Sequence, residues 1–247
     1  MDVKNKVVIV TGASSGIGYA TAKLFSEKGA KLALVARSKE KLEQLSKKLK
    51  DSIMLPADMT KPDEIKQIVK HTMAHFGRID VLVNCAGQGY DAPVERTDIA
   101  IFRHIFDLDV VGPLVSMQQV IPIMRIQNGG AIVNVSSDTA LMYLPNNGAY
   151  SAMKRALASM SLTVREELKH DGIVVSVVYP FVTLTDFEKN TIKDSSLLQE
   201  ALEEGELPFK PDTAKYAAQK ILEGVESGEP EIFAHDWMAK PAARNPY

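Results

Sequence analysis

The chain has 247 residues, of which 45% are hydrophobic and 24% are charged, and its formal net charge is −2. A nearly neutral chain has no overall electrostatic attraction for nucleic acid or for an anionic membrane, and its one cysteine excludes an internal disulfide. Because the sequence contains neither a charged-then-apolar leader nor an apolar run of about 18 residues, we expect one cytoplasmic domain over residues 1–247 that does not span a membrane.

The first predicted unit is a strand, a glycine turn and a helix. Residues 6–10 are apolar, residues 11–18 read TGASSGIG, and an amphipathic pattern then continues to about Gly29. Glycines let a backbone approach a ligand closely, and a helix N-terminus offers N–H groups to a pyrophosphate. The spacing Gly-x-x-x-Gly-x-Gly differs from the usual dinucleotide fingerprint. Its place after the first strand still favours a dinucleotide site over a turn that only packs.

The second predicted strand, residues 31–36, is followed by Arg37. An acidic residue at this place would bind the ribose hydroxyls of NAD, whereas a guanidinium can pair with the 2′-phosphate of NADP. The sequence therefore favours NADP(H) over NAD(H), against the alternative of a solvated arginine. We interpret Lys39 and Lys41, which add positive charge nearby, as solvated side chains.

The rest of the chain continues to alternate between strand and helix patterns. After a helix rich in Lys and Glu, the predicted elements are strand 52–56, helix 60–76, strand 80–84, helix 99–127, strand 131–136, helix 150–170, strand 174–179, helix 211–227 and strand 231–233. Thr60 and Asp63 have the spacing of a capping box at the start of their helix. Residues 183–205 are polar and charged, which suits a mobile lid over a site, and residues 237–247 look irregular.

Several reactive side chains in these segments are interpreted as structural. His71 and His75 share a helix face, but no third ligand is evident, so no metal is implied. Asp107 and Asp109 are two residues apart, and such residues do not face each other on a helix. Cys85 has no neighbouring signal that would activate its thiol, and we interpret it as a packing residue.

One stretch brings a hydroxyl, a phenol and an amine together. Ser137 follows the strand 131–136, and Tyr150 and Lys154 are four residues apart on one face of the next helix. An ammonium near a phenol favours the phenolate and brings its pKa closer to neutral pH. Tyr150 could then protonate an alkoxide or deprotonate an alcohol, while Ser137 orients the substrate oxygen.

With these motifs, the chain resembles the short-chain dehydrogenase/reductase family over nearly its whole length. The glycine turn, the Asn-Cys-Ala-Gly run at residues 84–87 and the Ser, Tyr and Lys above match family motifs in order and spacing. The resemblance implies an α/β fold: a single Rossmann-type, doubly wound domain with a seven-stranded parallel sheet flanked by helices. It also implies hydride transfer at the nicotinamide C4 with Tyr150 as acid or base, and a lysine that holds the nicotinamide ribose.

The resemblance assigns site residues one by one. The implied catalytic residues are Ser137, Tyr150, Lys154 and Asp109. The implied cofactor-binding residues are Gly12, Ser14, Ser15, Gly16, Ile17, Gly18, Arg37, Asp58 (the acid that contacts adenine), Met59, Asn84, Ala86, Gly87, Tyr150, Lys154, Pro180, Val182 and Thr185.

Two positions depart from the family pattern. Asp109 stands where the family has a catalytic asparagine, so the backbone carbonyl is kept but the amide donors are lost, and we expect an altered proton relay. Phe181 stands where the family has glycine after Pro180, and its ring is expected to narrow or line the substrate pocket.

The substrate is less well defined by sequence. The leading hypothesis is an NADPH-dependent reductase of a small or medium apolar ketone or aldehyde, because the expected lid carries apolar side chains at Phe187, Leu197, Leu198 and Leu202. A 3-oxoacyl-[acyl-carrier-protein] reductase-like enzyme comes second, since the glycine-rich ending of those reductases is missing. A non-catalytic NADP-binding regulatory protein is the third alternative. The family's dimer surfaces match helices 99–127 and 150–170, so we expect a homodimer, with a tetramer left open.

Overall fold

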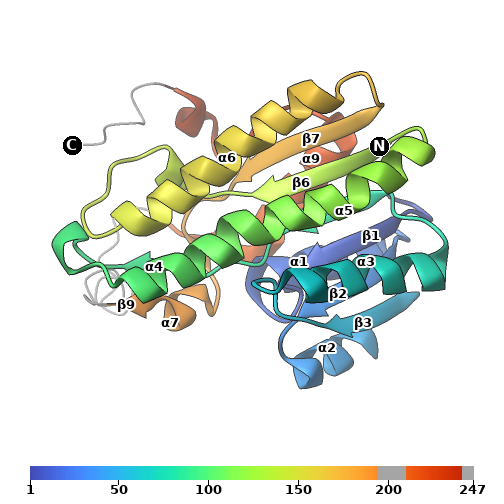
Figure 1. Cartoon of the computed structure of the whole chain (residues 1–247), viewed down its shortest axis with the longest axis horizontal. Helices are drawn as coiled ribbons and strands as arrows, with labels where there is room; N and C mark the ends of the chain where they lie inside the picture. The colour runs from blue at the N-terminus through green and yellow to red at the C-terminus, as the bar shows by residue number, and fades with distance from the viewer. Residues whose placement is uncertain (194–209, 241–247) are drawn as a thin grey trace.

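The computed structural model describes residues 1–193 and 210–240. Its centre is a seven-stranded sheet in which every neighbouring pair is parallel, in the order β11-β7-β6-β4-β1-β2-β3 (Figure 1). The strands are β1 (Val7–Thr11), β2 (Lys31–Ala36), β3 (Ser52–Pro56), β4 (Val81–Asn84), β6 (Gly130–Val135), β7 (Ile173–Tyr179) and β11 (Glu231–Phe233). The expected doubly wound, seven-stranded parallel sheet is confirmed.

Helices cover both faces of the sheet and make two separate cores. One face packs against α1 (Gly16–Glu27), α2 (Lys39–Ser46) and α9 (Ala214–Ser227), and the other against α3 (Pro62–Phe76), α5 (Gly112–Ile126) and α6 (Gly148–Leu168), which is in front of the sheet in Figure 1. Side chains of a strand alternate between faces. Val8 and Val10 accordingly enter the core with Phe25 of α1, whereas Ile9 enters the core with Ile65 of α3.

The predicted single helix over residues 99–127 is wrong. It is divided into α4 (Ile99–Phe106), a π turn over Asp107–Val111 and α5. Pro113 has no N–H to donate to the carbonyl of Asp109, so an unbroken α-helical ladder is impossible there. Instead, the N–H of Gly112 donates to the carbonyl of Asp107, five residues earlier. The turn leaves Asp107 exposed and buries Asp109 completely, in agreement with the expectation that the two carboxylates do not face each other.

The capping box predicted at Thr60 is also wrong. Helix α3 begins at Pro62, and its N-cap residue, Lys61, makes no side-chain cap hydrogen bond. Thr60 donates both its backbone N–H and its hydroxyl to Oδ1 of Asp58, at 2.9 and 2.8 Å. Thr60 therefore orients the carboxylate of Asp58 rather than capping the helix.

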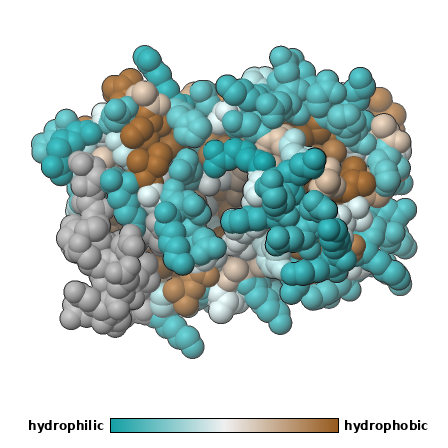
Figure 2. Space-filling view, turned by 90° about the horizontal axis from the view of Figure 1, so that it is seen from below, coloured by the Kyte–Doolittle hydropathy of each residue, from teal (hydrophilic) through white to brown (hydrophobic). Residues whose placement is uncertain are grey.

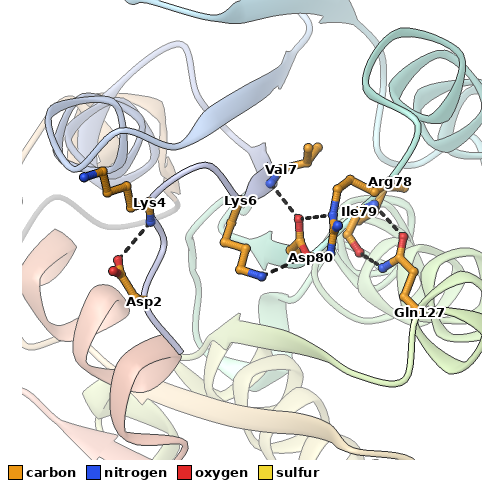
Figure 3. A network of polar contacts seen from close by, with 8 residues as sticks. All are labelled: Asp2, Lys4, Lys6, Val7, Arg78, Ile79, Asp80 and Gln127. Atoms are coloured by element: carbon orange, nitrogen blue, oxygen red, sulfur yellow. Dashed lines mark hydrogen bonds and ion pairs between the residues drawn. The ribbon is translucent and has the colours of Figure 1, made fainter.

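An ionic cluster fixes the amino ends of two central strands. The carboxylate of Asp80 is 4% exposed and accepts a hydrogen bond of 2.9 Å from the backbone N–H of Val7 (Figure 3). The guanidinium of Arg78 donates to it twice, at 2.9 and 2.6 Å, and the ammonium of Lys6 is 3.7 Å away. These contacts hold the start of β4 against the start of β1, at the edge of the sheet opposite the carboxyl ends of its strands.

Two small parallel sheets border those carboxyl ends. The first pairs β8 (Thr183–Leu184) with β10 (Asp212–Thr213), and the second pairs β5 (Tyr90–Asp91) with β9 (Ile192–Lys193). A short helix, α7 (Phe187–Asn190), lies between β8 and β9. The expected lid over residues 183–205 is thus described as far as residue 193, and its apolar positions Leu197, Leu198 and Leu202 lie outside the described residues.

The segment after β11 is more ordered than expected. Residues 237–240 were predicted to be irregular, but a 3-10 helix, η4, covers Asp236–Ala239. Residues 241–247 of this segment lie outside the described part of the chain. No helix within residues 1–193 and 210–240 combines the length and apolar character needed to cross a membrane.

Candidate active site

A cleft of about 1340 Å³ opens at the carboxyl ends of the strands. Its floor includes the ends of the neighbouring strands β1 and β4, whose following segments run in opposite directions along the sheet. Ligands of open parallel sheets usually bind at such a point. Figure 2 views the molecule from below Figure 1 and shows a hollow between hydrophilic rims. Lining residues come from both α2 and α7, so the cleft extends across most of the sheet.

Glycines shape the floor of this cleft. Gly12 and Gly16 have φ values of 72° and 53°, which residues with a Cβ rarely adopt. A Cβ on Gly18 would lie 2.3 Å from the carbonyl oxygen of Gly12, so no side chain fits there without a shift of the backbone. Helix α1 begins in this turn, and the side chain of Ser15 does not cap it. The turn therefore offers a close-fitting cradle and uncapped helix N–H groups, which suit a pyrophosphate.

A basic and an acidic residue lie beside the glycine turn. Arg37, exposed at the end of β2, and Asp58, after β3, both line the cleft, as do Glu40 and Lys41 of α2. Burial raises the pKa of Asp58, but the hydrogen bonds from Thr60 and the positive charge of Arg37 outweigh burial and hold that pKa below its usual value. Asp58 is therefore a carboxylate at neutral pH.

The end of β4 is held against β1 by a threonine. The hydroxyl of Thr11 accepts hydrogen bonds from the N–H groups of Cys85 and Ala86, each 3.0 Å long. The side chain of Asn84 points away from the cleft, and its amide donates to Asn134 at 2.8 Å. Burial raises the pKa of the Cys85 thiol to about 12, so it stays protonated at neutral pH, consistent with a packing residue.

Three buried polar residues line the cleft beside the end of β6. Ser137 follows β6, and Tyr150 and Lys154 come from the first turns of α6. The ammonium nitrogen of Lys154 lies 5.5 Å from the ring centre of Tyr150 and donates to the carbonyl of Val135 at 3.3 Å. The hydroxyl of Ser137 donates to Oδ1 of Asp138 at 2.8 Å. An acid or base, a positive charge and a hydroxyl are therefore together at one place.

Asp109 lies directly behind this group. Its carboxylate is 3.1 Å from the ammonium of Lys154 and accepts a hydrogen bond of 3.2 Å from the backbone N–H of Gln88. Gly87 leaves room for the pair, because a Cβ there would lie 3.1 Å from the Lys154 nitrogen and 3.2 Å from Asp109 Oδ1. Complete burial raises the pKa of Asp109, and the charge of Lys154 opposes that rise. Asp109 therefore acts on the cleft through its neighbours Lys154 and Gln88, both of which line it.

Most of the predicted site residues lie around this one cleft. All of them line the cleft except Asn84 and Asp109, whose side chains lie behind its wall. The residues in the cleft are Gly12, Ser14, Ser15, Gly16, Ile17, Gly18, Arg37, Asp58, Met59, Ala86, Gly87, Ser137, Tyr150, Lys154, Pro180, Val182 and Thr185.

Other cleft residues were missed by sequence reasoning. Asp91 accepts a hydrogen bond of 2.7 Å from Asn147; burial raises the pKa of Asp91, while this hydrogen bond lowers it. Asp138 could have been identified as a cleft residue from the sequence, because it directly follows Ser137. His235 and Trp237 had none, because they reach the cleft only through the pairing of β11 with β7. Within the described residues, no three His, Cys, Asp or Glu side chains are arranged to hold a metal ion.

Comparisons with known proteins agree with this architecture. The family model described as short chain dehydrogenase matches residues 6–196. A protein of Staphylococcus saprophyticus described as an uncharacterized oxidoreductase is 32% identical over 248 residues, which cover 99% of each chain. An uncharacterized oxidoreductase of Staphylococcus aureus is 33% identical over 178 residues, or 71% of this chain and 77% of that one.

Two solved structures have a similar fold. A short-chain dehydrogenase from Streptomyces avermitilis superposes with a TM-score of 0.85 at 29% identity, covering 96% of this chain and 90% of that one. A short chain dehydrogenase/reductase from Burkholderia phymatum, solved in complex with NAD, gives a TM-score of 0.87 at 22% identity, covering 96% and 92%.

Proposed function

Since this chain belongs to the short-chain dehydrogenase family of oxidoreductases, we propose that it reduces a ketone or aldehyde with NADPH, or oxidises the matching alcohol with NADP⁺. One observation carries the proposal: Ser137, Tyr150 and Lys154 line the same cleft as the glycine turn. A reacting carbonyl and a dinucleotide can therefore share one cavity.

The residues of the cleft fit a phosphorylated dinucleotide. The glycine turn and the N–H groups at the start of α1 would hold the pyrophosphate, and Asp58 would face the adenine. Arg37 supports the choice of NADP over NAD, because its guanidinium can form charge-assisted hydrogen bonds to a 2′-phosphate. When bound, this cofactor supplies the hydride for reduction or accepts it in oxidation.

Proton transfer falls to Tyr150. In the direction of reduction, its phenol gives a proton to the substrate oxygen as that oxygen gains negative charge, and the ammonium of Lys154 stabilises the phenolate that remains. Ser137 exchanges its hydrogen bond to Asp138 for one to the substrate oxygen. In oxidation the same groups act in reverse, with Tyr150 as the base.

Asp109 has an indirect part in this scheme. Its carboxylate pairs with Lys154, so it fixes the position of the ammonium and offsets part of its charge. We propose it as a positioning residue rather than as a group that touches the substrate.

The experiment that tests the proposal compares Tyr150→Phe with Tyr143→Phe on a panel of ketones and aldehydes. Tyr143 is a matched control, because its phenol is 63% exposed and lies outside the cleft. Loss of the Tyr150 proton should lower kcat by about 10² to 10⁴-fold, and Tyr143→Phe should match the wild type. If no carbonyl in the panel oxidises NADPH, the reductase proposal is wrong. NADPH binding without turnover would then favour the non-catalytic alternative.

We further propose a homodimer that works in the cytoplasm. A chain with a single cysteine suits a reducing compartment. The helices α4 and α5 expose the apolar side chains of Ile99, Phe106 and Ile126, which supports an interface there. Light scattering of the purified protein would distinguish a dimer from a monomer or a tetramer.

A further inference from the structure

Aromatic rings gather on one side of the cleft. Phe181, His235 and Trp237, called the aromatic wall below, all line it. The ring of Phe181 is nearly perpendicular to both other rings, with centroid distances of 5.6 Å to His235 and 5.4 Å to Trp237. The rings of His235 and Trp237 are nearly parallel, at 9°. Three rings from two distant parts of the chain therefore form one surface.

Contacts with Tyr216 and Asp212 fix the His235 ring of the wall. The His235 ring stacks on Tyr216 of α9 at 5.8 Å, and the Tyr216 hydroxyl donates to the carbonyl of Ala234 at 2.6 Å. Nε2 of His235 lies 3.0 Å from a carboxylate oxygen of Asp212, whose own N–H donates to Val182 at 2.8 Å. A ring surface fixed in this way loses little conformational freedom when a ligand binds to it.

The wall lies next to the proposed reacting groups. The N–H of Asp138 donates to the carbonyl of Pro180 at 2.9 Å, so the residue before Phe181 touches the residue after Ser137. On another side, the ring of Tyr150 packs against Phe187 at a centroid distance of 5.9 Å. The place where Ser137 and Tyr150 can share a substrate oxygen is therefore bordered by aromatic rings.

The wall is also far from Arg37. Phe181 follows β7 and Arg37 follows β2, and the strands β6, β4 and β1 lie between them. At a spacing of about 4.8 Å per strand, the two ends of the cleft are separated by about 19 Å. If Arg37 marks the adenosine end, the wall is at the substrate end.

We propose that the aromatic wall binds an aromatic ring of the substrate, so that the preferred substrates are ketones and aldehydes carrying a phenyl-like ring, or the matching alcohols. This inference rests on the proposed function, because the ring must present its carbonyl to Ser137 and Tyr150. Edge-to-face and offset stacked ring pairs add affinity beyond the burial of area, and we expect a preference of roughly 3- to 10-fold over a saturated ring of the same size.

The chain's single tryptophan makes binding measurable without turnover. Trp237 is the only tryptophan in the sequence and is 41% exposed, so its fluorescence reports directly on the wall. The probes are 4-phenylbutan-2-one and 4-cyclohexylbutan-2-one, which differ only in the saturation of the ring. Each is titrated into the wild-type protein saturated with NADP⁺. The expected result is a change in Trp237 emission with a Kd for the phenyl ketone roughly 3- to 10-fold lower than for the cyclohexyl ketone.

Kinetics of variants give the second measurement. Trp237→Leu should reduce the phenyl-to-cyclohexyl ratio of kcat/KM to about one, whereas Trp237→Phe should keep most of it. Tyr143→Leu, a change outside the cleft, should keep the wild-type ratio. Thermal unfolding checks that each variant is folded. If Trp237→Leu does not fold, Phe181→Leu removes another ring of the wall and takes its place in the test.

Each outcome separates this inference from the proposed function. Equal affinity for the two ketones, or an unchanged ratio in folded Trp237→Leu, would overturn it. A full change in emission with NADP⁺ alone, with no further change on adding ketone, would mean that the wall contacts the cofactor and would also overturn it. If the phenyl ketone binds at Trp237 with the expected preference but no carbonyl is reduced, the wall inference is supported and the proposed reaction is wrong.

Discussion

The ammonium nitrogen of Lys154 lies 3.1 Å from a carboxylate oxygen of Asp109, and the exposed fractions of the two side chains are only 5% and 0%. Two opposite charges in such a place depend on each other, because either one alone would be buried without compensation. The ammonium of Lys154 also lies 5.5 Å from the ring centre of Tyr150, so the charge that Tyr150 experiences is that of the pair.

Asp109→Asn should shift the pH dependence of the reaction. Removing the carboxylate leaves the Lys154 ammonium uncompensated, which favours the phenolate of Tyr150 more strongly. The pH profile of kcat/KM should move to lower pH by about one unit, in both reaction directions. As the pH falls through the raised pKa of Asp109, the wild-type residue is itself protonated, so the two enzymes should become more alike in acid.

The control for that change is Asp107→Asn. Asp107 is two residues away in the same π turn but is exposed, so its variant should keep the wild-type profile. A profile that does not move in Asp109→Asn would mean that the pair has no influence on Tyr150.

Arg37→Ala should weaken the binding of NADPH and leave NADH binding nearly unchanged. A charge-assisted hydrogen bond contributes about 1.5 to 3 kcal/mol, so its loss should raise the Kd for NADPH by about 10- to 100-fold. Titration of cofactor fluorescence measures both affinities. Lys39→Ala is the matched control, since Lys39 lies two residues after Arg37 in sequence but does not line the cleft. Equal affinity of the wild type for NADPH and NADH would contradict the assignment of Arg37 to a 2′-phosphate.

Gly87→Ala should lower turnover without unfolding the protein. The new Cβ would lie 3.1 Å from the Lys154 nitrogen, and the flexible ammonium would have to move away. A displacement of about 1 Å in a positioned group can lower the rate by about 100-fold, and we expect a loss of 10- to 100-fold in kcat. Gly224→Ala in α9 is the control, because a Cβ there meets only ordinary contacts of 3.5 Å or more, with Ile232, Ser176 and Val133. Wild-type turnover in Gly87→Ala would show that the position of the ammonium is not critical.

Asp80→Ala should destabilise the fold and spare the chemistry. The buried carboxylate accepts hydrogen bonds from Val7 and Arg78 at the edge of the sheet opposite the cleft. Its loss should lower the free energy of unfolding by about 3 kcal/mol, measured by urea denaturation. Asp63→Ala removes an exposed pairing with Lys66 and should leave the urea midpoint of unfolding close to that of the wild type. A large loss of kcat in folded Asp80→Ala would contradict the separation of the two edges.

Local patterns were enough to predict most of the fold. The strands at Lys31–Ala36 and Ser52–Pro56 have the predicted bounds, since apolar, β-branched runs between polar turns have few alternatives. The prediction of one helix over residues 99–127 failed at Asp107–Val111, where the structure has a π turn. The spacing of apolar residues does not reveal one extra residue in a single helical turn. The capping box at Thr60 failed for a different reason: the helix begins two residues later, at Pro62, and the hydroxyl of Thr60 donates to the carboxylate of Asp58 instead.

The site was predictable where its residues are close in sequence or match a family motif. Tyr150 and Lys154 share a helix face, and the glycine turn directly follows β1. The aromatic wall was not predictable, because His235 comes near Phe181 only after β11 has paired with β7. For Asn84, a matching motif identified the residue, but the motif could not show that its side chain donates to Asn134 and not into the cleft.

The π turn also sets the rotation of everything that follows it in α5. Each residue of an α-helix advances the direction of the side chains by about 100°, so one extra residue at Asp107–Val111 determines which side chains of α5 face the sheet and which face outward. Deleting a single residue from this turn would therefore do more than withdraw Asp109. It would turn Met117 and Val120 out of the core and bring other side chains, Ile126 among them, to new directions on the outer surface.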